Sequence, residues 1–150
     1  MHSWRDGLDA AAQADLDRLL DSGIRVAQGN LAAASEFDPF AILVAVDGRL
    51  LAVDLDTSEL GKHPDAEQIR AAAAAQLRHL APSARCTALV SNTRLSRERT
   101  DAVEVRLEHQ SGTALLVLLP YKRPKFGGQT EWGKLTAYPA KPLVWRSAHA

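Results

Sequence analysis

Residues 35–54 read Ser-Glu-Phe-Asp-Pro-Phe-Ala-Ile-Leu-Val-Ala-Val-Asp-Gly-Arg-Leu-Leu-Ala-Val-Asp, and this stretch decides the fold near the start of the chain. Two apolar segments, Phe40 to Val46 and Arg49 to Leu55, flank the dipeptide Asp47-Gly48. An Asp-Gly pair between strand-like segments is typical of a two-residue hairpin turn with positive φ angles. The stretch therefore predicts a β-hairpin, and its nearly all-apolar first strand should be covered on both faces.

A first helix is predicted before the hairpin, from about Trp4 to Asn30. Apolar residues recur there three, four or eight positions apart, which places them on one face of a helix. Ser3 and Asp6 form a capping-box pattern at its start. Ser22-Gly23 interrupts the apolar pattern, so a bend or break is expected at that point.

A second helix is predicted after the hairpin. Pro64 suits the first helical position, and Asp65 and Glu67 suit the positive end of the helix dipole. The alanine-rich face from Ala71 to Ala75 permits close packing on a sheet. Pro82 should stop this helix, because a proline disfavours helical geometry in the residue before it.

Three further strands are predicted, at Cys86 to Leu95, Ala102 to His109 and Thr113 to Tyr121. Apolar and charged residues alternate in the middle strand, which predicts one buried face and one wet face. The third strand is almost wholly apolar, as a central strand covered on both faces would be. A short strand is expected around Lys134 to Tyr138, in a tail that wraps the body with Trp145 as an anchor.

These elements predict an α+β fold in the order α-β-β-α-β-β-β. Hairpin connections dominate, so the sheet of about five strands should be mainly antiparallel, with the helices packed on it and an extended C-terminal tail. The 150 residues, 46% of them hydrophobic, suit a single globular domain over residues 1–150. The element order is similar to that of profilin-like and roadblock-type domains, which are mostly interaction modules.

Several segments from residue 35 onward together form a further pattern. They are Glu36-Phe37-Asp38-Pro39-Phe40 with its Asp-Gly hairpin, Thr100 to His109, Leu119 to Lys122, and Glu131-Trp132-Gly133 with Pro142 to Trp145. Together they resemble a family of small uncharacterised bacterial α+β domains with E-F-x-P-F and D-A-x-x-V-x-L-E-H patterns. The resemblance implies a complete stand-alone domain. It brings no catalytic residues, because no chemistry is assigned to that family.

Charge and composition exclude several classes of protein. The net charge is zero, yet residues 1–80 carry −6 and residues 81–150 carry +6. Overall neutrality argues against a dedicated nucleic-acid binder, and a dipolar surface favours self-contact, so a homodimer is worth testing. No segment approaches the roughly 18 uninterrupted apolar residues of a membrane span, and no signal region opens the chain. A soluble cytoplasmic protein that does not bind a membrane is expected.

Motifs that could carry catalysis are weak. Gly128 to Lys134 matches part of a phosphate-binding loop, but Leu135 replaces the residue that should contact Mg²⁺, and Pro139 and Pro142 leave little room for the following helix. The histidines lack metal-ligand spacing, and Cys86 is a lone cysteine that suits a small buried hydrophobe. No metal and no cofactor are therefore expected.

The strand from Ala102 to His109 holds the one cluster of acids and imidazole. Glu104 and Glu108 should share its wet face about 13 Å apart, which is too far for the carboxylate pair of a glycosidase. Arg106 lies between them, so the three side chains would display a flat charged row. His109 points to the opposite face and is expected to cap the strand near the surface.

A basic cluster, Lys122-Arg123-Pro124-Lys125, lies beside Tyr121. A solvated loop is the favoured interpretation, because sequence-independent binding of nucleic acid draws on several phosphate contacts. A nucleic-acid accessory protein would need these cations to form one continuous patch with Arg94.

The preferred hypothesis is a non-enzymatic protein-interaction or regulatory module, such as an accessory or immunity-type partner. Phe37 and Phe40 either staple the chain into the core or form an exposed aromatic anchor beside Glu36. The rival hypothesis is a small enzyme or small-molecule-binding domain whose pocket lies between the sheet and the helices and uses Glu36, His109 or Tyr121. The candidate binding residues are Glu36, Phe37, Phe40, Glu104, Arg106, Glu108, His109, Tyr121 and Lys122.

Overall fold

The computed structural model describes residues 9–124 and 128–145. The α+β class and the order α-β-β-α-β-β-β are confirmed, and the tail adds two short strands. The elements are α1 (Ala10–Ala33), β1 (Phe40–Ala45), β2 (Leu50–Ala52), η1 (Ser58–Leu60), α2 (Ala66–Leu80), η2 (Ala81–Ser83), β3 (Ala84–Leu95), β4 (Thr100–His109), β5 (Ala114–Lys122), β6 (Glu131–Trp132) and β7 (Thr136–Pro139).

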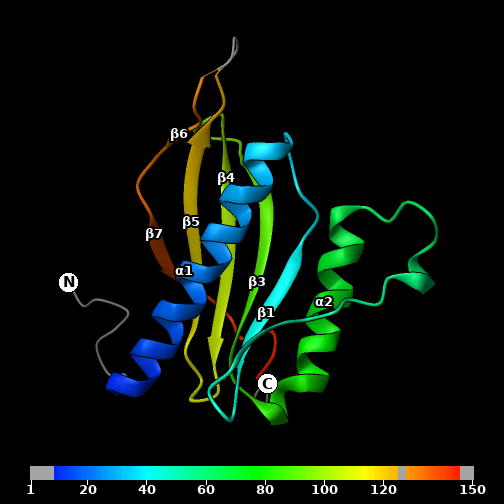
Figure 1. Cartoon of the computed structure of the whole chain (residues 1–150), viewed down its shortest axis with the longest axis vertical. Coiled ribbons are helices and arrows are strands. Elements are labelled where there is room, and N and C mark those ends of the chain that lie inside the picture. The colour runs from blue at the N-terminus through cyan, green and yellow to red at the C-terminus, as the bar shows by residue number, and fades with distance from the viewer. Residues whose placement is uncertain (1–8, 125–127, 146–150) are drawn as a thin grey trace.

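All strand pairs are antiparallel, and the sheet order is β2-β1-β3-β4-β5-β6, with β7 also pairing with β5. β1 lies between β2 and β3, because the chain returns through α2 to the free side of the hairpin. α1 lies diagonally across one face of the sheet, and α2 lies on the β1 side (Figure 1). The two faces are named here the α1 face and the α2 face.

The α1 face holds the larger apolar core. Leucines of α1, including the fully buried Leu16 and Leu19, pack against the inward residues of the central strands, such as Val90, Val105 and Leu107. Burying side chains of this size is the main favourable contribution to folding, at about 1.5–3 kcal/mol for each. This core therefore fixes α1 against the centre of the sheet.

The helix α1 begins at Ala10, later than the predicted start at Trp4. Asp9 is its N-cap, and the carboxylate of Asp9 accepts a hydrogen bond from the backbone N–H of Ala12 at 2.7 Å. The predicted capping pair Ser3 and Asp6 lies outside the described residues. At the other end, the helix continues to Ala33.

The predicted break at Ser22-Gly23 is wrong, because α1 runs unbroken through this position. Gly23 is buried where the helix crosses the sheet, and a Cβ atom there would lie 3.1 Å from Val90 Cγ2 and 3.6 Å from Ile42 Cδ1. The glycine therefore allows a close approach of helix and sheet rather than ending the helix.

The α2 face is covered by α2 and by the tail. Ala73 and Leu77 of α2 pack with Leu43, Leu89 and Val144 in a second, smaller core. The helix begins at Ala66, two residues after the predicted first helical position at Pro64. Asp65 is its N-cap, and it forms a reciprocal capping box with Gln68. The helix stops at Leu80, as Pro82 predicts.

The burial of β5 differs from the prediction of a strand covered on both faces. Its buried residues alternate with half-buried ones. The buried residues face α1, whereas α2, on the opposite face, lies over β1 and β3 rather than over β5. The predicted short strand at Lys134 to Tyr138 is present as β7.

Candidate functional site

The edge strand β2 is the best-formed candidate site. Its pairing with β1 uses the backbone of Arg49 and Val53: the Ala45 N–H donates to Arg49 O, and the Val53 N–H donates to Ala41 O. Backbone groups alternate in direction along an antiparallel strand, so those of Leu50 and Ala52 point away from β1. Among the described residues, β2 is the last strand on this side of the sheet, so these groups form an open edge.

An apolar groove lies on each face of this edge. On the α1 face, a groove of about 620 Å³ runs between β1 and the end of α1. On the α2 face, a groove of about 490 Å³ separates β2 from α2. Ala52 and Val53 line both grooves. A strand added at this edge would place alternate side chains in the two grooves.

Exposed apolar side chains gather at these grooves. Val26 is 45% exposed and lines the groove on the α1 face, while Val46 and Leu51 are 56% and 39% exposed and line the other. Among the large apolar residues of the described chain, only two others are exposed to this degree, Leu135 and Tyr138. A concentration of exposed apolar groups around one strand is typical of a binding surface.

The hairpin turn that carries β2 differs from the predicted two-residue turn. The Gly48 N–H donates to Ala45 O, and only Gly48 has a positive φ, at 90°. This arrangement matches a three-residue loop in which a type I turn is followed by a glycine in the left-handed region. The loop still requires glycine at this position, as the sequence predicts.

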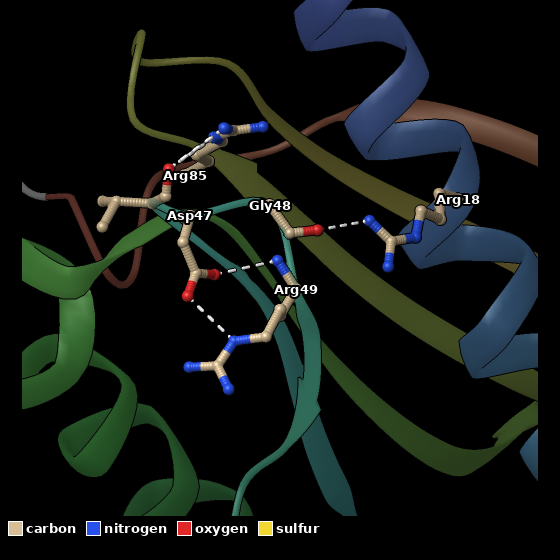
Figure 2. Close-up of polar contacts among 6 residues, drawn as sticks. Arg18, Asp47, Gly48, Arg49 and Arg85 are labelled. Atoms are coloured by element: carbon tan, nitrogen blue, oxygen red, sulfur yellow. Dashed lines mark hydrogen bonds and ion pairs between the residues drawn. The ribbon is translucent and has the colours of Figure 1, made fainter.

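Three arginines hold this turn in place (Figure 2). Arg18 of α1 donates to Gly48 O at 2.6 Å, and Arg85 of β3 donates from Nε and Nη2 to Val46 O at 3.2 and 3.0 Å. Arg49 donates from its backbone and from Nε to Asp47, at 3.0 and 2.8 Å. These contacts tie the turn to α1 and to β3, so the position of the β2 edge is set by both.

The motif Glu36-Phe37-Asp38-Pro39-Phe40 forms one wall of the groove on the α1 face. Phe37 and Phe40 are half-buried, pack against the core, and contact each other with ring centroids 5.7 Å apart. Both predicted roles are therefore combined, since the rings staple the chain and also line an open groove. Glu36 and Asp38 are exposed at its rim.

The rims of the two grooves are mainly acidic. Asp47 and Asp54 line the groove on the α2 face, where Arg49 is the one cation among the described lining residues, and its Nε lies 2.8 Å from Asp47. Glu36 and Asp38 add two carboxylates on the other side. The edge therefore presents an apolar strip between acidic rims.

At the opposite side of the sheet, the edge strand β7 is blocked by a proline. The Ala140 N–H donates to Ala114 O, so the alternation of backbone groups places the nitrogen of Pro139 on the outer side of β7. Proline offers no N–H there, and proline on an edge strand blocks the addition of another strand. β2 contains no proline, so it is the more open of the two edges.

Glu108 does not lie on an exposed charged row as predicted. It is 5% exposed, and its carboxylate accepts hydrogen bonds from the backbone N–H groups of Leu143, Val144 and Trp145 at 2.9 to 3.3 Å. The strand alternation was correct, but the tail covers this end of the wet face. Glu104 and Arg106 remain half-buried on the same face.

His109 is buried instead of capping the strand near the surface. Its Nδ1 accepts a hydrogen bond from the backbone N–H of Ser111 at 3.0 Å and lies 2.8 Å from Ser111 Oγ. An Nδ1 that accepts this N–H carries no proton, so the imidazole is neutral with its proton on Nε2. Burial also lowers the pKa of His109, while the carboxylates of Asp15 and Asp9 act in the opposite direction.

Cys86 is the cross-strand neighbour of His109. The thiol is fully buried, and burial raises its pKa to about 12, with a further contribution from Asp15. Cys86 is therefore a thiol at neutral pH, whereas a nucleophilic cysteine needs a lowered pKa. The pair is accordingly interpreted as part of the core.

Stability is expected to fall in mild acid because of His109. The folded state binds a proton to this imidazole less readily than the unfolded state, whose pKa is about 6.5. The contribution of His109 to the free energy of unfolding should therefore be constant above about pH 7.5 and decrease as the pH falls through 6.5, by at most about 1.4 kcal/mol per pH unit.

Urea unfolding at a series of pH values would measure this dependence. His109→Asn provides the control, because an asparagine Oδ1 can accept the Ser111 N–H without titrating. The slope near pH 6 should be smaller in this variant. Equal slopes in the two proteins would assign the acid sensitivity to other groups.

Tyr121, Glu36 and His109 do not share a site. Tyr121 is buried, its hydroxyl accepts a hydrogen bond from Asn92 Nδ2 at 2.5 Å, and burial raises its pKa. It lines a cavity beside Lys122 at the β5–β6 end of the sheet, whereas Glu36 lines the groove near β1. These residues therefore do not form the joint pocket that would favour the enzyme hypothesis.

The basic cluster is divided among separate contacts. Arg123 donates from Nη1 to the carbonyl oxygens of Leu31 and Ala34, at the end of α1. Arg94 pairs with Asp101 at 3.2 Å. Lys122 and Pro124 are exposed, and Lys125 lies outside the described residues. Arg123 and Arg94 thus have structural partners of their own.

The phosphate-loop match from Gly128 to Lys134 leads into strands. β6 lies inside the match and β7 follows it, so no helix starts at this point. Gly133 instead donates its N–H to Pro120 O at 2.7 Å. The described segment from Gly128 to Lys134 therefore lacks the helix start that a phosphate-binding loop needs.

Within residues 9–124 and 128–145, no group of three histidine, cysteine or acidic side chains could hold a metal ion. In the same part of the chain, none of the helices combines the length and the apolar character that crossing a membrane would require. Neither a family model, nor a curated protein, nor a solved structure matches this sequence.

Sequence reasoning missed the β2 edge as a site. The prediction of a strand from Arg49 to Leu55 identified the segment, but the structure limits β2 to Leu50–Ala52. Edges depend on which strands pair, and pairing is not encoded in the local pattern. The one available signal was the run of apolar residues from Leu50 to Val53 between Asp47 and Asp54.

Proposed function

We propose that this protein is a non-enzymatic interaction module that binds an extended segment of a partner protein along β2. The observation that carries the proposal is the open edge of β2 with an apolar groove on each face. When an extended peptide adds to such an edge as a further strand, two kinds of contact contribute to binding. Backbone hydrogen bonds supply affinity, and pockets for alternate side chains supply specificity.

The acidic rims favour one kind of partner. Glu36, Asp38 and Asp54 lie around the grooves, and Arg49, the one cation among their described lining residues, is paired with Asp47. A segment with apolar residues at its centre and lysine or arginine at its ends would complement this surface. A second copy of this chain would bring two acidic rims together, so a different protein is the favoured occupant.

The proposal can be tested with a substitution that removes a hydrogen-bond donor from the open edge and keeps the pairing of β2 with β1. Ala52→Pro removes the outward N–H of residue 52 and leaves the inward hydrogen bonds of Arg49 and Val53 to β1. Ala52→Ser is the matched control, because it changes the side chain and keeps the N–H. The probe is a labelled peptide of about eight residues, with valine and isoleucine at its centre and two lysines at each end.

Fluorescence anisotropy should show that the peptide binds to the wild-type protein and to Ala52→Ser. Ala52→Pro should weaken binding by about tenfold or more, which corresponds to about 1.4 kcal/mol. A peptide with glutamates in place of the lysines should bind more weakly, because it meets the acidic rims. Equal affinity of Ala52→Pro and Ala52→Ser would contradict strand addition, and sedimentation that shows a dimer lost only in Ala52→Pro would favour a second copy.

A further inference from the structure

A second cleft lies on the α2 face, between α2 and the central strands β3 and β4. Its volume is about 500 Å³, and it shares no lining residue with the two grooves beside β2. Apolar groups, including Ala74 and Leu89, form part of its lining. The polar and charged groups that line it are Glu67, Arg70, Arg78, Thr93, Glu104 and Arg106.

Arg106 has an unusual environment on β4. Its neighbours in register are Leu89 on β3 and Leu116 on β5, so an apolar row surrounds the base of its side chain. The side chain is 34% exposed, and its Nε lies 3.8 Å from Glu104 Oε2, which is too long for a hydrogen bond. No described residue accepts a hydrogen bond from this guanidinium. A partly desolvated cation with unused donors favours a bound anion.

The two arginines of α2 have free donor groups as well. Arg70 uses Nη2 to pair with Glu67 at 2.8 Å, and the Glu67 side chain is 85% exposed, which makes this a weak surface pair. Arg78 uses Nε to donate to Leu143 O at 2.7 Å. Each guanidinium has five N–H donors, so most donors of both arginines remain unused by these contacts.

The buried hydroxyl of Ser91 lies on β3, between two residues that line this cleft. Ser91 is on the same face of β3 as Leu89 and Thr93, directly opposite Glu104 on β4. It is almost completely buried, and its Oγ has no hydrogen-bond partner among the described residues. A buried polar group without a partner is costly and uncommon in a folded protein.

We propose that this cleft binds a small organic anion with a carboxylate or phosphate group. The lining of the cleft holds three guanidinium groups and two carboxylates, so its net charge is one positive charge, which favours an anion. Guanidinium groups suit carboxylate and phosphate because they donate two parallel hydrogen bonds. Glu104 and Glu67 would repel a long polyanion, so a ligand of one or two charges is favoured over nucleic acid.

Nuclear magnetic resonance would test the cleft with inorganic phosphate and succinate as probes. Amide shifts of the ¹⁵N-labelled chain would be recorded up to about 50 mM of each anion, with sodium chloride added to hold the ionic strength constant. Saturable shifts are expected at Thr93, Arg106 and Ala74. A response to phosphate alone or to succinate alone would distinguish the two kinds of anionic group.

Arg106→Gln should weaken the binding by about tenfold or more, because charge-assisted hydrogen bonds are the strong ones. Arg94→Gln is the matched control, since Arg94 is an arginine of the neighbouring strand that pairs with Asp101 outside the cleft. If Arg106→Gln does not fold, Arg70→Gln on the surface of α2 takes its place. Shifts that do not saturate, or equal affinities in the arginine and control variants, would overturn the proposal.

Discussion

Replacing Glu108 by alanine is expected to lower the free energy of unfolding by about 3 kcal/mol. The Glu108 carboxylate accepts hydrogen bonds from the backbone N–H groups of Leu143, Val144 and Trp145, and hydrogen bonds to a charged group contribute about 1.5–3 kcal/mol each. The sum is an upper limit, because the tail of the variant can detach and expose these N–H groups to water. Val144 would then leave the core on the α2 face.

The control is Glu104→Ala on the same face of β4. Glu104 is half-buried, and its ion pair with Arg106 is 3.8 Å long, so its loss should cost less than about 1 kcal/mol. Urea unfolding of both variants would give the two free energies, and limited proteolysis would show whether the tail of Glu108→Ala is released. Similar free energies for the two variants would show that the tail contacts contribute little.

Replacing Gly23 by leucine is expected to cost about 2–3 kcal/mol. The position is buried where α1 crosses the sheet, and even a Cβ atom would lie 3.1 Å from Val90 Cγ2. A larger side chain would force the helix away from the sheet or displace Val90 and Ile42, and overpacking of this kind costs about 1–3 kcal/mol. The gain in helix propensity over glycine, about 0.8 kcal/mol, is too small to offset it.

Gly29 offers a matched control in the same helix. Apart from the neighbouring residues and backbone of the helix itself, no heavy atom of the described residues lies within 4 Å of the Cβ that a substitution would add there. Gly29→Leu should therefore stabilise the protein by a few tenths to about 1 kcal/mol, through helix propensity alone. Thermal unfolding would show whether the two variants differ in stability as expected. An unchanged stability of Gly23→Leu would show that the helix can shift without loss of packing energy.

The elements of the fold were predictable because their signals are local. Apolar periodicity identified both helices and the long strands, and Asp47-Gly48 identified the hairpin. The prediction at Gly23 was wrong for a physical reason. Glycine lowers helix propensity by about 1 kcal/mol, but here the close contact with Val90 outweighs that local cost.

The sites were less predictable, because they depend on segments that are distant in the sequence. Alternation correctly placed Glu108 and His109 on opposite faces of β4, but it could not show that the tail covers Glu108 or that His109 is buried. Phe37 and Phe40 were identified from their own pattern. The edge of β2 and the cleft around Arg106 required the strand order and the position of α2, which no local pattern contains.

The burial of Cys86 has a consequence for assembly. The chain has a single thiol, and that thiol is fully buried on the central strand β3, near its start. Two native copies could not bring their sulfur atoms within the 2.05 Å or so of a disulfide without opening the core of each. Any pair of native chains must therefore be held by non-covalent contacts, so its lifetime should depend on concentration and salt and not on the redox state of the surroundings.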